Sequence, residues 1–336
     1  MVAASCESLV QEVGAYLVRT LAEMVELHAP QDVGCAIDNP VLAGELFAVL
    51  TSRAFCYLGR SKAERYRDGV VTSLQRRMTT GGPFRFFYDI GPGYHATTRP
   101  GVLPLCYDVG LAELLMLGQV NGLCRRLAEL YSPGGRFYFV IDNLCALRTN
   151  DIPVHLTEAY ARQFRRLIEA LRMSGRVELI VESEVFDIGE YDRLLSDVRA
   201  EPPGAEPSPE AVDNVARFLG RQCTSSEAIE RMECYRRASL VTGLLLDRLV
   251  KGVHMTQRAT GATLGFRPFP GGDQRTQAGE LVLSRNCNGR LRPMLLTSRN
   301  VDAYDCSRLE FPGMLPAPMT HITFASPRAT RPAQAK

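Results

Sequence analysis

The sequence predicts an α/β fold built on a mostly parallel sheet flanked by helices. Three observations predict it. Between residues 84 and 181, short apolar runs typical of strands alternate with helical patterns, as expected of crossovers on a parallel sheet. A chain of 336 residues with 46% hydrophobic content can bury one large core. Helical patterns before this region and short strand patterns after it add a helical N-terminal extension and a smaller C-terminal α+β portion. The fold class is therefore Rossmann-like.

The first predicted strand is Phe84–Tyr88, an apolar and aromatic run. Asp108 can cap the helix that comes next, and Pro133-Gly134-Gly135 ends it. The apolar residues of this helix are Leu111, Leu115, Leu123, Leu127 and Leu130.

The second predicted strand is Arg136–Ile141. Thr157 can cap the following helix, whose apolar residues fall on one face of a 3.6-residue repeat: Tyr160, Phe164, Leu167, Ile168 and Leu171. Ser174-Gly175 ends this helix, and Arg176–Val181 is the third predicted strand.

The whole chain is expected to divide into five segments. Repeated prolines between residues 200 and 210 exclude regular structure there, and a helical pattern over 211–252 is followed by strands near 280–284 and 294–297. The expected segments are a helical N-terminal segment 1–80, a Rossmann-like α/β core 81–199, an exposed Pro-rich loop 200–210, a C-terminal α+β part 211–325 that completes the site, and a disordered tail 326–336.

Composition limits the cellular compartments and the kinds of binding partner that are expected. Lys and Arg number 39 against 37 Asp and Glu, so no overall field draws the chain to nucleic acid or to a membrane surface. The 10 cysteines are scattered without a CxxC pair, which favours a reducing compartment. The first 30 residues lack the pattern of a signal peptide, and no apolar run reaches the roughly 18 to 20 residues that span a bilayer. A cytoplasmic location is expected.

Polar residues follow all three predicted strands. The first strand ends in Tyr88-Asp89, the second in Asp142-Asn143 and the third in Glu182-Ser183-Glu184. In open parallel sheets ligands bind beyond the carboxyl ends of the strands, so these positions are candidate ligand contacts. Capping and turn formation are the alternative explanation for the same residues.

The segment Asp89–His95 contains Gly91 and Gly93 directly after a strand. It resembles the first motif of S-adenosylmethionine-dependent methyltransferases, in which glycines allow the backbone to approach the cofactor. Such a loop opens a helix, but Pro100 and Pro104 disfavour a helix start before Asp108. The alternative is a substrate loop in which His95 and Arg99 face the site.

Basic residues gather again late in the chain. On a helix, Lys251, His254 and Arg258 would share one face, which can hold a phosphate or a carboxylate, and Arg285 follows further along. An ordinary solvated helix face is the alternative. Motifs of serine hydrolases, P-loop NTPases and zinc peptidases are missing, and the five histidines form no local metal motif, which leaves only a site assembled from distant segments.

The order of these features resembles the isonitrile (isocyanide) synthases of pyoverdine and dityrosine biosynthesis. The resemblance rests on Asp108-Val-Gly-Leu-Ala-Glu-Leu-Leu-Met-Leu, on Leu123-Cys124, on Leu130-Tyr-Ser-Pro-Gly-Gly-Arg-Phe137, and on a strand that closes on Asp142. It runs from about Phe84 to Thr297 and is specific only in the middle portion. The family's lysine-containing loop after the first strand is replaced here by Gly91–Pro100, its Asp-Gly becomes Asp142-Asn143, and its late histidine is absent. The chain would thus be a divergent member.

The resemblance implies condensation of an α-amino acid with ribulose 5-phosphate, whose C2 becomes the isonitrile carbon, without a metal or other cofactor. Anion clamps and acid/base groups are then required. The expected partners are these two small molecules and a downstream oxygenase of the same pathway, with no nucleic acid and no membrane. The candidate clamps are Arg85, Arg99, Arg148, Lys251, Arg258 and Arg285. The candidate proton-transfer groups are Asp142, Glu182, His254 and His95, with Tyr88 or Tyr94 beside them. A methyltransferase and a non-catalytic metabolite-binding relative remain the alternatives.

Overall fold

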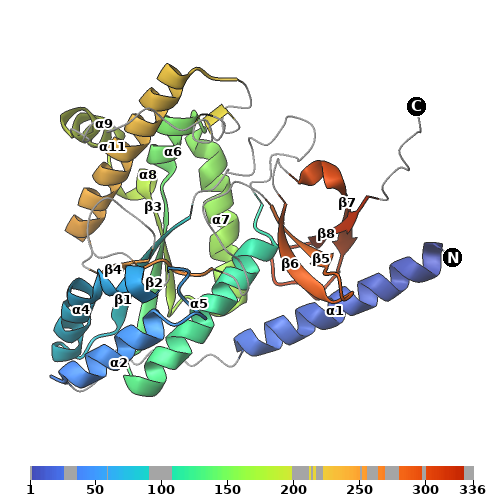
Figure 1. Cartoon of the computed structure of the whole chain (residues 1–336), viewed down its shortest axis with the longest axis horizontal. Helices are drawn as coiled ribbons and strands as arrows, with labels where there is room; N and C mark the ends of the chain where they lie inside the picture. Colours follow the sequence, from blue (N-terminus) through green and yellow to red (C-terminus); the bar gives the residue numbers. More distant parts are fainter. Residues whose placement is uncertain are drawn as a thin grey trace.

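A computed structural model describes residues 2–25, 36–58, 60–90, 108–198, 212, 215–216, 222–249, 252–255, 264–268, 280–296 and 300–328. The predicted fold class is confirmed. Four parallel strands in the order β3-β2-β1-β4 form a sheet flanked by helices, and a second sheet in the order β6-β5-β8-β7 lies towards the C-terminus (Figure 1).

The elements of the first half and of the parallel sheet have these bounds: α1 Val2–Val25, α2 Pro40–Leu50, α3 Arg60–Glu64, α4 Arg67–Thr79, β1 Phe84–Ile90, α5 Leu111–Leu130, β2 Gly135–Ile141, α6 Asn143–Asn150, α7 Val154–Ala170, β3 Val177–Val181, α8 Glu182–Val185, α9 Ile188–Asp197, α11 Ser225–Leu249 and β4 Val253–His254. The C-terminal elements are β5 Glu280–Arg285, β6 Leu291–Leu296, the 3₁₀ turn η1 Val301–Ala303, β7 Tyr304–Glu310 and β8 His321–Pro327.

The parallel sheet is buried on both faces because its strands are apolar on both sides. On one face Phe86 and Phe137 lie 5.1 Å apart between ring centroids and join the core that α5 and α7 cover. On the other face Phe87 and Tyr138 stack at 5.2 Å in a second cluster, which α9 and α11 cover. Alternate residues of one strand point to opposite faces, so an unbroken apolar run is what a doubly covered sheet requires.

Strand β4 reverses the order of the sheet. The chain steps from β1 to β2 to β3 in one direction, and then α11 returns it to the opposite edge, where β4 pairs with β1. In sheets of this kind the crevice beyond the carboxyl ends of the strands, at the point of reversal, is the usual ligand position.

Gly252 allows this strand to approach β1. A Cβ at position 252 would lie 2.6 Å from the Arg85 carbonyl oxygen and 2.7 Å from the Phe87 ring. Gly252→Ala is therefore expected to separate β4 from β1 and to lower the free energy of unfolding by about 1 to 3 kcal/mol, measured by urea denaturation. Gly122→Ala in α5 is the control, since a Cβ there would lie no closer than 3.7 Å to another residue, the Phe55 ring, and its φ is not in the left-handed region. Equal losses in the two variants would contradict the steric argument.

The second sheet and α1 share the main core with the parallel sheet. Leu283 and Phe324 of the second sheet belong to the same buried cluster as Leu17 of α1 and Leu123 of α5. Figure 1 shows α1 running beside the second sheet, with α5 between the two sheets. The C-terminal part is therefore packed into the fold along α5.

Two helices begin at residues other than the predicted caps. Helix α5 starts at Leu111, and Glu113 accepts from the backbone N–H of Gly110 at 2.7 Å, while Asp108 accepts from Gln163 at 2.6 Å. Helix α7 starts at Val154, because Pro153 sets φ near the helical value and donates no hydrogen bond. Thr157 lies inside that helix, where its hydroxyl donates to the Val154 carbonyl oxygen.

The prediction that residues 251–258 form one helix face is wrong at residues 253 and 254. Val253 and His254 form β4, because pairing with Phe86 and Phe87 satisfies their backbone within the sheet. Short helices α6, α8 and α9 and strands β7 and β8 were not predicted, and β8 extends to Pro327. The Pro-rich loop 200–210 and residues 329–336 lie outside the described residues.

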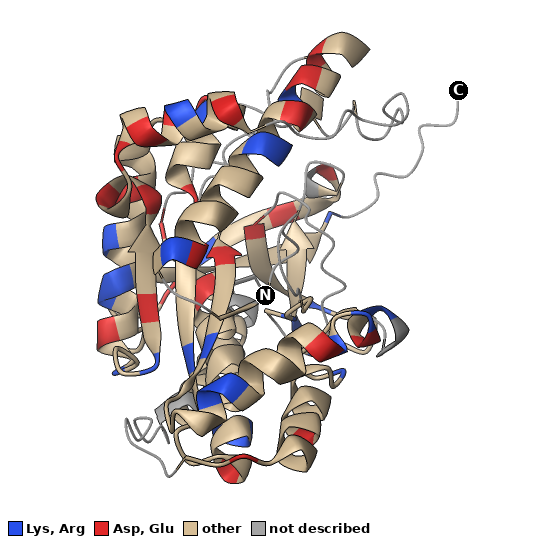
Figure 2. Ribbon diagram, turned by 90° about the vertical axis from the view of Figure 1, so that its left-hand side faces the viewer, with Lys and Arg blue, Asp and Glu red and all other residues tan. Residues whose placement is uncertain are grey.

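Two surface and composition features can be followed in the described residues. Basic and acidic residues are interspersed along the helices in Figure 2, as the near-balanced charge predicts. Cys56, Cys124 and Cys145 are buried thiols that act as small apolar side chains.

In the part of the chain that the structure describes, no helix has both the length and the apolar character of a membrane span.

Candidate functional site

The polar ends of β2 and β3 lie side by side. Ile141 pairs with Val181 in the parallel register, so Asp142 and Glu182 follow at the same edge of the sheet. Both side chains are largely buried, with 8% of Asp142 and none of Glu182 exposed. This edge is the candidate site.

Glu182 stabilises the start of α6 from a neighbouring strand. One carboxylate oxygen accepts from the backbone N–H groups of Leu144 at 3.0 Å and Cys145 at 3.1 Å. The other accepts from the hydroxyl of Thr242 on α11. A carboxylate at a helix N-terminus also interacts favourably with the helix dipole. The contacts give Glu182 a positioning role, since it is enclosed by donors from α6 and α11.

Asp142 occupies the N-cap position of α6, yet its side chain makes no cap hydrogen bond. A side chain at an N-cap normally accepts from the N2 or N3 amide. Here Glu182 accepts from those two amides instead. The Asp142 carboxylate, which follows the carboxyl end of a central strand, therefore does not cap α6.

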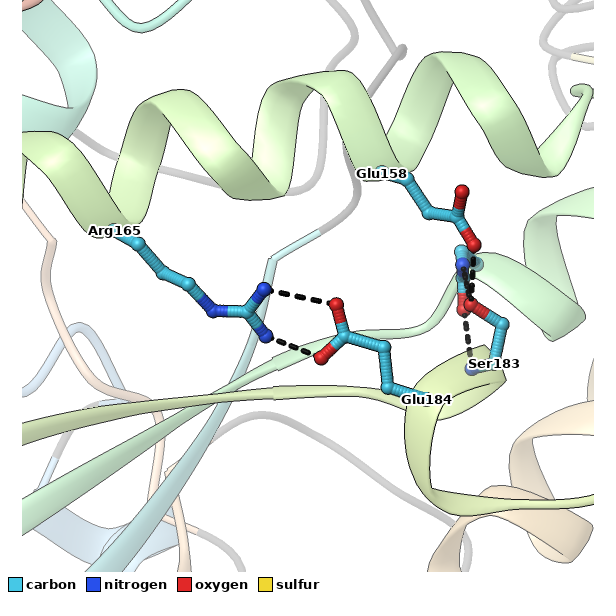
Figure 3. Close-up of polar contacts among 5 residues, drawn as sticks. Glu158, Arg165, Ser183 and Glu184 are labelled. Carbon is cyan, nitrogen blue, oxygen red and sulfur yellow. Dashed lines mark hydrogen bonds and ion pairs between the residues drawn. The ribbon is translucent and has the colours of Figure 1, made fainter.

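A chain of hydrogen bonds connects this edge to α7. Asn143 donates to the Ser183 hydroxyl at 2.7 Å, and Ser183 donates to Glu158 of α7 at 3.2 Å. The backbone N–H of Ser183 donates back to Asn143 at 3.0 Å. Figure 3 shows Glu158 beside Ser183, and Arg165 two helical turns further along α7, paired with Glu184. Glu158 is half-buried, and Ser183 links its carboxylate to Asn143.

Tyr191 of α9 closes the opposite side of the edge. Its hydroxyl donates to the Ala238 carbonyl oxygen at 3.2 Å and lies 3.4 Å from the Thr242 hydroxyl. Burial raises the pKa of Tyr191 far above its ordinary value, and the charges of Glu182 and Asp142 add to this rise. The phenol therefore stays protonated and neutral beside the two carboxylates.

Glu113 and Tyr160 form a second polar pair that the sequence reasoning missed as site residues. Glu113 is 7% exposed and accepts from the Tyr160 hydroxyl at 2.9 Å. Glu113 lies in the first turn of α5, the first described helix after β1, and Tyr160 belongs to α7. The hydrogen bond therefore joins the start of α5 to α7. The signal that was available is the acidic residue three positions after Gly110, a common helix-start pattern.

Tyr88 and Asp89 close β1. The Tyr88 ring contacts Phe139 and Phe266 edge-on, with centroids 6.0 and 5.4 Å away. Burial raises the pKa of Tyr88, with smaller contributions from Tyr57 and Asp89. Tyr88 thus packs against the apolar face below the edge and keeps a neutral phenol.

Two predicted anion clamps lie on other parts of the fold, and a third, Arg148 on α6, is already paired. Arg85 pairs in register with Arg136, and at 3.3 Å per residue the six positions from Arg136 to Asp142 span about 20 Å. Arg148 forms an ion pair with Asp192 of α9, and Arg285 of β5 pairs with Glu12 of α1. The sheet direction therefore puts Arg85 at the other end of the sheet from Asp142, the second sheet holds Arg285, and Arg148, although on α6, is engaged by Asp192.

The other predicted site residues can be located only in part. His254 is the second residue of β4, beside Phe87 in the register. His95, Tyr94, Arg99, Lys251 and Arg258 lie outside the described residues, as does the Gly91 loop of the methyltransferase alternative.

Comparisons with known proteins identify the fold. The chain matches no protein-family model and no curated protein sequence. Among solved structures it is similar to the PvcA protein from Pseudomonas aeruginosa, with a TM-score of 0.63 and 18% identity over 84% of this chain and 99% of that one. At this identity the likeness concerns the fold.

Two tyrosyl-tRNA synthetases are more distant neighbours. The enzyme from Archaeoglobus fulgidus, solved with L-tyrosine, gives a TM-score of 0.32 at 11% identity over 66% of this chain and 63% of that one. The enzyme from Aeropyrum pernix gives 0.31 at 14% identity over 63% and 59%. With TM-scores this low, neither synthetase structure supports any conclusion about the candidate site.

Proposed function

We propose that the chain is a biosynthetic enzyme that condenses the amine of an α-amino acid with ribulose 5-phosphate, in the manner of an isonitrile synthase. The observation that carries the proposal is Asp142, a nearly buried carboxylate relieved of capping at the end of a central strand. The sequence resemblance over Asp108–Asp142 and the fold shared with PvcA support it.

The proposed reaction requires two kinds of proton transfer. The amine must lose protons as it attacks the C2 carbonyl of the sugar phosphate, and water must leave to form the imine. In the sugar C2 is bonded to both C1 and C3, so the C1–C2 and the C2–C3 bonds must both break for C2 to remain alone on the amino acid nitrogen. We assign Asp142 as the principal acid/base group, with Glu158 as a second one reached through Ser183.

Glu182 and Tyr191 are assigned positioning roles beside Asp142. Glu182 anchors α6, and Tyr191 connects α9 to α11 through Ala238. The pair Glu113–Tyr160 is a further candidate for proton transfer on the α5 side. Arg99, Lys251 and Arg258 stay proposed contacts of the phosphate and carboxylate groups, and His95 and His254 stay proposed acid/base groups.

The test is incubation of the full chain with ribulose 5-phosphate carrying ¹³C at C2 and, one at a time, each common amino acid. Carbon NMR is expected to show the label in an isonitrile carbon with tyrosine or tryptophan, the amino acids that the family resemblance implies. Unphosphorylated ribulose serves as the control and is expected to give no product. Failure of every amino acid to take up the labelled carbon would argue against the proposal.

A further inference from the structure

A recess lies between helix α2, the turn 51–58 and the start of α4. Its volume is about 740 Å³, within the range of small-molecule sites. Three arginines line it: Arg53 from the turn, Arg67 from α4, and Arg267 from the segment after β4. We call it the arginine recess.

Two segments far apart in the sequence build the recess. Cys56 and Phe266 form an antiparallel bridge, in which Tyr57 donates its N–H to the Gly265 carbonyl oxygen at 2.8 Å. Arg267 donates its backbone N–H to the Phe55 carbonyl oxygen at 2.7 Å. These bonds fix the backbone that carries Arg53 and Arg267 in one position relative to the other.

The arginine recess is cationic. The lining residues include three arginines and one carboxylate, Glu64, which gives them a net charge of +2. Glu64 pairs with Arg67 at 2.8 Å, on a rim where both side chains are about half exposed. The Arg67 guanidinium also lies over the ring of Phe47, another lining residue, 5.8 Å from its centroid.

The floor adds no negative charge. Cys56 is 3% exposed, and its thiol lies 3.5 Å from the Leu58 carbonyl oxygen. Burial raises the pKa of Cys56 despite the opposing effect of Arg267, so the thiol stays neutral at physiological pH. Phe47, Ala48 and Leu58 give the recess an apolar wall beside its arginines.

We infer that the arginine recess binds the phosphate group of a small organic phosphate, with the carbon part of the ligand against Phe47 and Leu58. A phosphate monoester carries about −1.5 to −2 charges at pH 7, which matches the charge of the lining. Its three terminal oxygens accept from more than one guanidinium fork, whereas a carboxylate is satisfied by one.

This site is distinct from the edge at Asp142. The Phe266 ring lies 5.4 Å from both Tyr88 and Phe137, so the segment that carries Arg267 packs on the α5 face of the sheet. Asp142 instead lies near Tyr191, towards α9 and α11. The inference does not depend on the proposed reaction, because binding is measured without turnover.

The test is isothermal titration of the full chain with glycerol 1-phosphate and with inorganic phosphate. Glycerol and acetate serve as ligand controls and are expected to show no binding. Arg53→Glu, a change on the exposed rim, and Arg267→Gln are each expected to weaken glycerol 1-phosphate binding by about tenfold or more. The matched control is Arg126→Gln, which removes an exposed arginine paired with Glu129 elsewhere and is expected to bind as the unmodified chain does.

Two results would overturn the inference. One is no binding of glycerol 1-phosphate to the unmodified chain up to about 10 mM, the weak end of specific affinities. The other is binding that Arg53→Glu leaves unchanged. Since Arg53 lies on an exposed turn, that variant reports on the recess even if Arg267→Gln does not fold.

Discussion

Glu182→Ala is expected to lower the free energy of unfolding by about 3 to 5 kcal/mol. The substitution leaves two amide N–H groups of α6 and the Thr242 hydroxyl buried without their acceptor. It also opens a cavity where a fully buried side chain was. Urea denaturation followed by circular dichroism measures the change.

The matched control is Glu178→Ala, on the same strand. Glu178 is exposed, so its removal is expected to change stability by about 0.5 kcal/mol or less. Glu182→Gln keeps the side-chain volume and one acceptor oxygen. Its loss of unfolding free energy is expected to lie between those of Glu182→Ala and Glu178→Ala. A loss for Glu182→Ala no larger than that for Glu178→Ala would show that Glu182 does not anchor α6.

Asp142→Asn is expected to reduce the rate of product formation about 100- to 10,000-fold, the usual range for the loss of a general acid/base. The amide has nearly the shape of the carboxylate and cannot accept a proton. The Asp142 side chain makes no cap bond, and Glu182 still caps α6, so the fold is expected to persist. Single-turnover rates and thermal unfolding, measured together, check both parts.

Asp187→Asn provides the matched control for Asp142→Asn. Asp187 is also a helix N-cap, but its side chain accepts from the Glu190 N–H at 2.9 Å and is exposed at the start of α9. Its replacement is expected to leave the rate unchanged. Equal rates in the unmodified chain and in Asp142→Asn would remove Asp142 from the proposed chemistry.

Much of the parallel sheet could be predicted because its signals are local. The aromatic run Phe84–Tyr88 and the run Arg136–Ile141 are too apolar for surface loops, and the periodic helix around Phe164 separates the second and third strands. Strand β4 could not be predicted this way, since it has two residues and is defined by its pairing with β1.

The candidate site was predicted in part. Asp142 and Glu182 follow strands, and parallel strands bring their carboxyl ends to one edge, so their proximity follows from the pattern. Their different contacts do not follow from it, because the partner of Glu182 is decided by where α6 and α11 pack. Glu113 and Glu158 were missed since their neighbours, Tyr160 and Ser183, are distant in the sequence.

The sequence by itself determined the fold class, the three main strands and the acidic residues at the ends of two of them. Periodicity and strand composition act over a few residues, so they can be read along the chain. Only the tertiary structure decided that Glu182 caps α6 while Asp142 does not, that Arg85 lies at the far end of the sheet, and that Arg53 and Arg267 share a recess. These are contacts between segments distant in the sequence, and their free energies depend on burial and on charges that other elements supply.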